Sequence, residues 1–227
     1  MARALAELID AVLPTTCICC GTLGPHICLA CRPRFVFSNH QVVRGQLTGV
    51  AATALDEPVR QLLSALKDKG RTAALGEVIN PLAVALEQGF GQDLVSGTEQ
   101  VVPRLVAMPT SRRSRRTRGF DLNAMLVRRV ARQLGVPVDF GLRFTRQPLD
   151  QRRLDETERL ANLEGAMRFT PSRAGAPLIL IDDVVTTGAT LGEAARAIAA
   201  AGGNLIGFCV FAETRLRRDS PVTMCEK

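Results

Sequence analysis

The clearest pattern of hydrophobic and polar positions runs from residue 178 to residue 203. Residues 178–181 are four consecutive aliphatic residues and predict a short strand that is buried on both faces. Two carboxylates, Asp182 and Asp183, follow where such a strand would leave its sheet. Strong helix formers then extend over residues 191–201 and end at a pair of glycines. The pattern therefore predicts a strand, a polar loop and a helix.

The polar loop has the composition of a phosphate-binding loop. In open α/β sheets ligands bind at the carboxyl ends of strands, and a loop that opens a helix offers backbone N–H groups to an anion. Gly188 permits positive φ and a close approach of the backbone, and the threonines add hydroxyl donors. The candidate residues are Val184, Val185, Thr186, Thr187, Gly188, Ala189 and Thr190.

The two carboxylates indicate a ligand with more than a phosphate. Anions repel a neighbouring phosphate unless they bind hydroxyl groups or a divalent cation. A sugar phosphate with free vicinal hydroxyls, or its Mg²⁺ complex, satisfies both requirements. The alternative is an ordinary strand, turn and helix in which Asp and Thr cap the helix, although capping needs only one such residue.

Other segments complete an α/β pattern. We expect a short N-terminal helix stopped by Pro14, and a charged excursion over residues 148–165 whose length suggests a mobile active-site cover. Candidate residues in that cover are Gln151, Arg159 and Asn162. The remaining expectations are helices over 51–87 and 122–134, a surface loop over 89–100, buried strands at 105–108 and 205–211, and paired strands at 143–147 and 166–169.

Charge adds a second candidate for anion binding. The chain of 227 residues has a net charge of +7, which suits phosphate-rich ligands or nucleic acid, or only a soluble basic surface. Five arginines lie within residues 112–118, between a predicted strand and a predicted helix. Guanidinium groups bind phosphate oxygens in pairs, so we expect Thr110, Ser111, Arg112 and Arg113 to bind pyrophosphate, or the segment to bind a nucleic-acid backbone. By contrast, Lys67 and Lys69 are interpreted as a solvated helix end in preference to the alternative, a direct role in phosphate binding.

Composition narrows the classes of function. The chain has no Trp or Tyr, so recognition by base stacking on an aromatic platform is disfavoured. No apolar run approaches the roughly 18 residues of a membrane span, and the first residues lack the apolar core of a signal peptide. We therefore expect a cytoplasmic protein without membrane insertion.

Four of the seven cysteines form two C-x2-C pairs separated by seven residues. Cys17, Cys20, Cys28 and Cys31 are the predicted ligands of a Zn²⁺ ion, because paired knuckles at this spacing place four thiolates around the metal. Cys19 is interpreted as a spare thiol and His26 as a loop histidine. Disulfides are the alternative, which a cytoplasmic setting disfavours. A closed four-thiolate site stabilises a module and does not catalyse.

These motifs carry a family resemblance. Residues 178–190 resemble the phosphoribosyl pyrophosphate (PRPP) motif of type I phosphoribosyltransferases, in which the acidic pair holds the ribose hydroxyls and the loop holds the 5′-phosphate. Together with the cysteine knuckles, the segment 109–120 ending in Arg-Gly-Phe and the segment 151–166, they make the chain similar to the ComF/GntX family. Two departures are Asp121-Leu122, where the family often has Asn-Gln, and residues 55–57, which lack aromatic side chains.

The resemblance implies a mostly parallel sheet flanked by helices, with an N-terminal zinc module over residues 1–45, a phosphoribosyltransferase-like domain over 46–215 and a polar tail over 216–227. It also implies PRPP with Mg²⁺ as ligand, an unknown acceptor, and a role in DNA uptake during natural competence. The alternatives are a non-catalytic adaptor that binds single-stranded DNA with an uptake helicase or channel as partner and PRPP as a regulator, and a zinc-dependent interaction module with a degenerate transferase domain. Whether the chain catalyses a reaction is left open.

Overall fold

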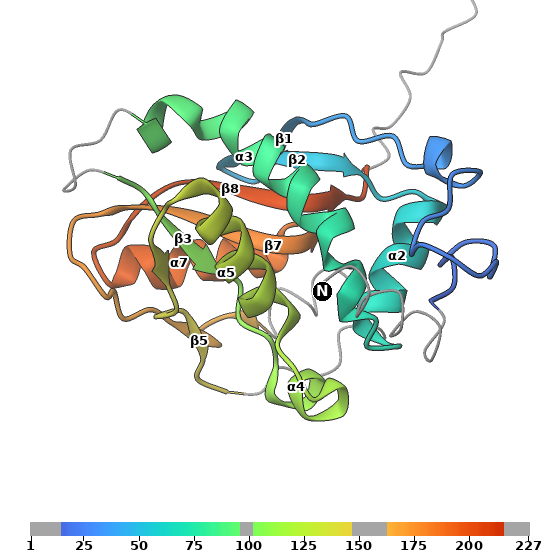
Figure 1. Ribbon diagram of the computed structural model, residues 1–227. Coiled ribbons are helices and arrows are strands. Elements are labelled where there is room, and N and C mark those ends of the chain that lie inside the picture. Colours follow the sequence, from blue (N-terminus) through green and yellow to red (C-terminus); the bar gives the residue numbers. More distant parts are fainter. Residues whose placement is uncertain (1–14, 96–101, 147–162, 216–227) are drawn as a thin grey trace, which may run out of the picture.

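The computed structural model of the chain describes residues 15–95, 102–146 and 163–215, and its centre is a six-stranded sheet (Figure 1). The strand order is β1-β2-β8-β7-β3-β4, and all neighbours are parallel except the hairpin of β1 and β2. A two-stranded antiparallel sheet pairs β5 with β6. The bounds are β1 His40–Arg44, β2 Leu47–Ala54, β3 Arg104–Ala107, β4 Val138–Asp139, β5 Arg143–Phe144, β6 Met167–Arg168, β7 Pro177–Val185 and β8 Asn204–Glu213.

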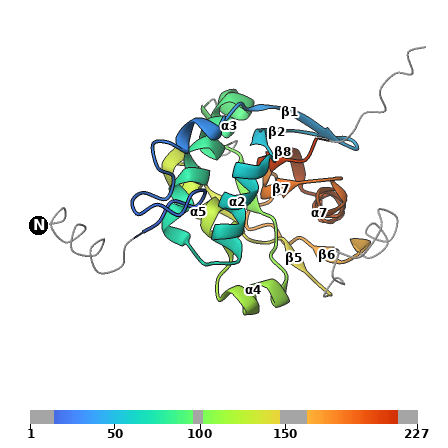
Figure 2. The ribbon, with the colours of Figure 1, turned by 90° about the vertical axis from the view of Figure 1, so that its right-hand side faces the viewer.

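Helices cover both faces of the sheet. On one face lie α2 (Glu57–Lys67), α3 (Gly76–Val95) and α5 (Leu122–Leu134), and on the other lies α7 (Ala189–Ala200) (Figure 2). A short helix, α4 (Arg112–Arg118), follows β3, and two 3₁₀ turns span Arg32–Arg34 and Thr72–Leu75. Figure 2 looks onto the carboxyl ends of the parallel strands, with α2, α4 and the β5-β6 pair around them.

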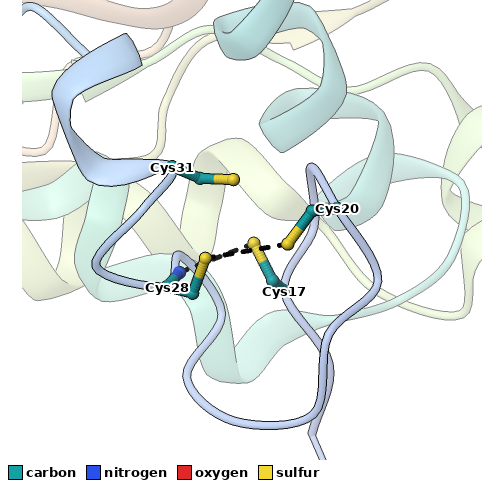
Figure 3. Close-up of side chains that lie close together, drawn as sticks. All are labelled: Cys17, Cys20, Cys28 and Cys31. Atoms are coloured by element: carbon teal, nitrogen blue, oxygen red, sulfur yellow. Dashed lines mark hydrogen bonds between the residues drawn. The ribbon is translucent and has the colours of Figure 1, made fainter.

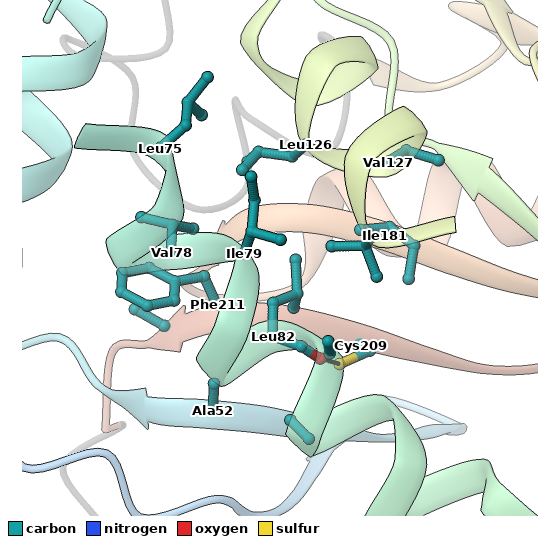
Figure 4. Packing of buried hydrophobic residues seen from close by; sticks show 14 of the residues in the cluster. Ala52, Leu75, Val78, Ile79, Leu82, Leu126, Val127, Ile181, Cys209 and Phe211 are labelled. Atoms are coloured by element: carbon teal, nitrogen blue, oxygen red, sulfur yellow. Dashed lines mark hydrogen bonds between the residues drawn. The ribbon is translucent and has the colours of Figure 1, made fainter. Parts of the chain in front are cut away.

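The alternation of β7 divides the buried residues into two clusters. Ile179 and Ile181 pack into the cluster shared with α2, α3 and α5, and Leu178 and Leu180 pack into the cluster under α7. Figure 4 shows Ile181 in the first of these clusters. Because both faces are buried, the strand reads as a continuous aliphatic run. The predicted fold class, a mostly parallel sheet flanked by helices, is confirmed.

Several predicted elements differ from the structure. The helical prediction over 51–87 is wrong at its start, because residues 47–54 form β2. The predicted loop over 89–100 is wrong up to residue 95, where α3 ends, and the arginine segment is a helix and not a loop. The strands at 105–108 and 205–211, the pairing of 143–147 with 166–169 and the helix at 122–134 are confirmed to within a few residues.

Some expectations fall outside the described residues. These are the N-terminal helix, the cover residues Gln151, Arg159 and Asn162, and the polar tail. None of the helices in the described part of the chain is both long and apolar enough to span a membrane.

Replacing Leu82 by alanine should destabilise the fold strongly. The side chain has no exposed surface and lies on α3 within the larger cluster (Figure 4). A leucine-to-alanine cavity in a packed core costs about 3 kcal/mol. The matched control is Val84→Ala on the same helix, where the side chain is 45% exposed and the expected cost is below about 1 kcal/mol. Urea unfolding of the two variants measures the difference, and equal midpoints would contradict the assignment of the core.

Candidate functional site

The acidic pair lies near the C-terminal end of β7. Asp183 is buried, and Asp182 is half-buried. Oδ1 of Asp182 accepts hydrogen bonds from Nδ2 of Asn123 at 2.8 Å and from the backbone N–H of Asp183 at 2.9 Å. The strand is thus longer than the four predicted residues, and it carries the carboxylates at the edge of the sheet where ligands bind in α/β folds.

The surroundings of Asp182 disfavour its charge. Burial and the neighbouring charge of Asp183 raise the pKa of Asp182 to about 7, although the hydrogen bonds from Asp183 and Asn123 and the charge of Lys67 oppose this shift. Desolvation and a like charge both favour the protonated carboxyl. A carboxyl group that titrates near neutral pH at a strand end is typical of a functional site.

Lys67 is a site residue that the sequence interpretation missed. It is the last residue of α2, and its Nζ lies 2.6 Å from Oδ2 of Asp183. Its side chain is 23% exposed, so it is not the solvated helix end that the sequence suggests. No local pattern predicts this contact, because the two residues are far apart in the chain and only the fold brings them together.

Asn123 is the second missed residue. It lies in the buried stripe of α5 beside Leu122, Leu126 and Val127, and its Nδ2 also donates to the backbone oxygen of Met108 at 3.2 Å. A buried asparagine costs free energy unless its polar atoms are bonded. This polar position in an otherwise apolar stripe is the sequence signal that identifies it.

The threonine loop joins β7 to α7. Val184 and Val185 complete the strand, Thr186, Thr187 and Gly188 form the connection, and Ala189 and Thr190 begin the helix. Gly188 is the N-cap residue with φ of +90°, a conformation that other residues rarely adopt. The structure therefore brings the carboxylates and the loop together, as the spacing predicts.

The arginine segment forms α4, which lies below the β5-β6 pair in Figure 2. Ser111 caps it by accepting from the backbone N–H of Ser114 at 3.1 Å, and Arg112 and Arg113 are exposed. Oγ1 of Thr110 donates to Oδ1 of Asp121 at 2.8 Å, and the same oxygen accepts from the N–H of Ala124 at 3.1 Å. Asp121 thus caps α5 and fixes the segment after β3, which gives this departure from the family pattern a structural role.

The four knuckle cysteines form one cluster (Figure 3). The Sγ atoms of Cys17, Cys20, Cys28 and Cys31 all lie within 4.8 Å of one another, and those of Cys20 and Cys28 are 3.6 Å apart. Tetrahedral zinc with Zn–S bonds of about 2.3 Å needs sulfur atoms about 3.8 Å apart, so the donor set fits. Cys19 is not part of the cluster. Among the described residues these cysteines are free thiols, so the disulfide alternative is not supported.

The backbone around Cys17 favours a thiolate at this cysteine. Burial raises the pKa of Cys17, but hydrogen bonds from the backbone N–H groups of Cys28, Cys20 and Cys19 outweigh it and lower the pKa to about 6. The N–H of Cys28 lies 3.5 Å from Sγ of Cys17. Metal ligation needs deprotonated thiols, so these donors prepare Cys17 for a cation.

Comparisons with known proteins match part of the chain. Residues 124–227 match the model of the phosphoribosyl transferase domain. The chain is 33% identical over 98 residues to the DNA utilization protein YhgH of Salmonella typhimurium and to that of Escherichia coli K12. Each match covers 43% of this chain and 43% of the relative, so the chain matches less than half the length of these proteins.

The solved structures that match the chain are more distant in sequence. The orotate phosphoribosyltransferase of Aeropyrum pernix is 14% identical with a TM-score of 0.38, over 68% of this chain and 63% of that one. An adenine phosphoribosyltransferase of Saccharomyces cerevisiae is 15% identical with a TM-score of 0.39, over 77% and 83%. The domain match and the curated relatives support the resemblance drawn from the sequence: residues 124–227 resemble a phosphoribosyl transferase domain, and the four-cysteine cluster lies ahead of them in the chain.

Proposed function

We propose that the chain binds PRPP as its Mg²⁺ complex and acts as a phosphoribosyltransferase-like protein in DNA uptake in the cytoplasm. The observation that carries this proposal is the continuity of β7 and α7. An acidic pair that can accept from two ribose hydroxyls lies directly before a threonine-glycine loop that opens a helix. Asp182 and Asp183 would orient the ribose, and residues 184–190 would hold its 5′-phosphate.

The proposed chemistry breaks the bond between C1 of the ribose and pyrophosphate. Pyrophosphate leaves with the bonding electrons while a nucleophile of the acceptor bonds to C1, through a transition state with positive charge on the ring. The carboxylates of Asp182 and Asp183 stabilise that charge, and the arginines Arg112 and Arg113 neutralise the leaving group. Bound Mg²⁺ would screen the pyrophosphate charges, and hard carboxylate oxygens are donors that suit it.

Lys67 has a place in the same proposal. Its ammonium group, 2.6 Å from Asp183, offsets the repulsion between the two carboxylates in the free protein. A pyrophosphate group bound nearby would offer the lysine a second anionic partner. Gln151, Arg159 and Asn162 are proposed to exclude water from the reacting centre.

Calorimetric titration with Mg-PRPP tests the proposal. Wild type should bind in the micromolar range, about −8 kcal/mol, and Asp183→Asn and Thr187→Ala should lose most of that affinity. Thr48→Ala, at an exposed position of β2, is the control and should bind like wild type. A wild type that binds no Mg-PRPP would rule out the sugar-phosphate site. Pyrophosphate release in the presence of nucleobases or ammonia then tests for catalysis.

The affinity for Mg-PRPP should rise with pH. The Asp182 carboxyl has a pKa of about 7, and only its ionised form accepts from ribose hydroxyls or binds a cation. Ionisation of one such group between pH 6 and pH 8 changes the competent fraction about tenfold. Titrations across this range measure the effect. Asp182→Asn is the control for ionisation of the ligand itself, and an equal pH dependence in both proteins would assign the effect to PRPP.

A second candidate is binding of single-stranded DNA, alone or with an uptake helicase or channel. The exposed arginines of α4 and the similarity to proteins named for DNA utilization favour it. The affinity for an oligonucleotide should fall steeply with salt, and replacing Arg115 and Arg116 by glutamine should flatten that dependence. Replacing Arg173 and Arg168, which lie elsewhere, gives a variant of equal net charge as the control. Equal salt slopes in the two double variants would leave α4 without a role in DNA binding.

We also propose that the four-cysteine cluster holds a structural Zn²⁺ ion. Four thiolates leave no open coordination position, so this metal stabilises the fold and takes no part in the reaction. Metal analysis of the purified protein should give one zinc per chain.

A further inference from the structure

Arg44, the last residue of β1, lies behind the threonine loop. Its side chain is 7% exposed, and its Nε donates to the backbone oxygen of Thr186 at 2.6 Å. The sequence pattern assigns no function to the hairpin of β1 and β2. Burying a charged side chain costs free energy unless the charge is paired, so the burial of an arginine against a loop of the proposed site needs an explanation.

The loop is built against this arginine. A Cβ added at Gly188 would lie 2.7 Å from Cβ and 3.1 Å from Cγ of Arg44. Two features therefore require glycine at position 188. Its φ of +90° disfavours other residues, and the aliphatic stem of Arg44 leaves no room for a Cβ. The guanidinium group and the aliphatic stem together fix the path of residues 186–188.

Arg44 is itself fixed from the far side. Its terminal nitrogen Nη2 donates to Oε2 of Glu213 and to the backbone oxygen of Thr214, both at 2.9 Å. The other oxygen of Glu213 lies 2.7 Å from Nε2 of His40, and Nδ1 of His40 lies 2.8 Å from the oxygen of Ser38. The charge of Arg44 is thus paired, and its guanidinium group is held in one orientation.

Because the peptide bond is planar, the hydrogen bond from Arg44 to the oxygen of Thr186 also sets the direction of the N–H of Thr187. Among the described residues there are no cis peptide bonds, and in a trans peptide the C=O and the N–H of the next residue point in opposite directions. Arg44 draws the oxygen of Thr186 toward the β1-β2 hairpin. The N–H of Thr187 consequently points away from Arg44, toward the opposite side of the loop.

We propose that Arg44 is a positioning residue that orients the Thr186-Thr187 peptide so that the N–H of Thr187 donates to the 5′-phosphate of a sugar phosphate. This rests on the proposed role of residues 184–190 in phosphate binding. Arg44 itself does not touch the ligand. Without it the peptide can rotate, and its carbonyl oxygen, which repels phosphate, can turn toward the ligand.

Two ligands separate positioning from general stability. Ribose 5-phosphate carries the group that the loop would hold, whereas pyrophosphate carries the groups assigned to Arg112 and Arg113. In Arg44→Lys and Arg44→Met, titrated with Mg²⁺ present, the affinity for ribose 5-phosphate should fall about tenfold or more, because one misplaced donor in a preorganised site has an effect of that size. The affinity for pyrophosphate should stay within about twofold of wild type.

Lysine is the informative replacement. It keeps the positive charge, but a single ammonium group cannot reproduce the fork that joins Thr186, Glu213 and Thr214. Arg60→Lys is the matched control, because Arg60 donates to the backbone oxygen of Leu55 at an exposed position. If Arg44→Met does not fold, Arg44→Lys and Glu213→Gln carry the test, and the unfolding midpoints of all variants are measured alongside.

The outcomes distinguish this proposal from the one on which it rests. Wild type that binds neither ribose 5-phosphate nor Mg-PRPP would overturn the sugar-phosphate site itself, and the role of Arg44 with it. Wild type that binds, together with Arg44→Lys that binds ribose 5-phosphate equally well, would overturn only the role of Arg44. Equal losses for ribose 5-phosphate and pyrophosphate would also overturn it, because they would show a structural effect without preference for the loop.

Discussion

Removal of the metal from the four-cysteine cluster is expected to destabilise the transferase domain and not only the N-terminal module. Cys17 and Cys31 belong to the same buried cluster as α2, α3 and α5, and Ile27, between the two knuckles, is among the largest fully buried side chains. Structural zinc sites contribute on the order of 10 kcal/mol to folding in small peptides. Because much of the domain core persists without the metal, we expect a loss of about 4 kcal/mol from Cys17→Ser or from a strong chelator.

Polar contacts connect the four-cysteine module to the helices of the transferase domain, so loss of the metal should also affect the candidate site. Arg32 makes two hydrogen bonds of 2.9 Å to Glu77 at the start of α3, and Arg71 donates to the backbone oxygen of Thr16, next to Cys17. Arg71 follows α2 by four residues, and α2 ends with Lys67. A knuckle that loosens therefore releases one contact at the start of α3 and one just after α2, the helix whose Lys67 contacts Asp183.

Thermal unfolding with and without chelator measures the effect. Cys19→Ser is the matched control, because Cys19 lies in the same loop but outside the cluster. Its unfolding midpoint should differ little from that of wild type, and its zinc content should stay at one ion per chain. Equal midpoints for Cys17→Ser and Cys19→Ser would contradict a metal-stabilised core.

The sequence predicted those parts of the fold whose signal is local. The aliphatic run, the two carboxylates and the threonine-glycine loop follow one another in the chain. The sequence pattern therefore predicts both β7 and the start of α7. The two cysteine knuckles are equally local. In both cases the residues that act together are within about 15 positions of one another, where spacing constrains geometry directly.

β2 was mistaken for a helix because its residues are small. The strand reads Leu-Thr-Gly-Val-Ala-Ala-Thr-Ala, and alanine favours helices. The structure shows why small residues are needed here: a Cβ at Gly49 would lie 2.5 Å from Cγ of Phe208, and one at Gly89 on α3 would lie 2.3 Å from Cγ2 of Val50. The small residues of β2 are therefore explained by its close packing against β8 and α3, and not by a preference for helix.

The missed site residues share a different cause. Lys67, Asn123 and Arg44 reach the proposed site from α2, α5 and β1, and their partners lie on β7, on the threonine loop and on β8. Only the strand order brings these elements together, and no spacing in the chain encodes it. The helix α4 was missed although its caps, Ser111 and Gly119, were visible, because a run of arginines is usually solvated loop.

Asp182→Asn is expected to stabilise the protein while it weakens binding of the sugar phosphate. In the folded state the pKa of Asp182 is about 7, well above the ordinary value of 3.8. A raised carboxyl pKa means that the folded protein holds a proton that the unfolded chain has released. Stability therefore falls as pH rises from about 4 to about 7, and the whole penalty applies above pH 7.

Asparagine removes that penalty because it carries no charge beside Asp183. Its Oδ1 can still accept from Asn123 and from the N–H of Asp183, so the local geometry has a reason to persist. A shift of this size corresponds to at most about 4 kcal/mol, and partial solvation reduces it, so we expect a gain of about 2 kcal/mol at pH 8. The gain should be small at about pH 4 and disappear below about pH 3, where wild type is protonated in both states.

Opposite effects on stability and binding distinguish a functional carboxylate from a structural one. Asp182→Asn should raise the free energy of unfolding at pH 8, yet lower the affinity for Mg-PRPP about 100-fold, because the amide cannot match a carboxylate toward ribose hydroxyls or a cation. Denaturant unfolding at pH 4 and pH 8, with calorimetry at pH 8, measures both. Asp139→Asn is the contrasting variant, since Oδ2 of Asp139 accepts from the N–H and Oγ of Ser172, and it should lose stability. If Asp182→Asn destabilises the protein, the carboxylate is retained for the fold. Ligand binding would then not explain why two carboxylates that repel each other lie side by side.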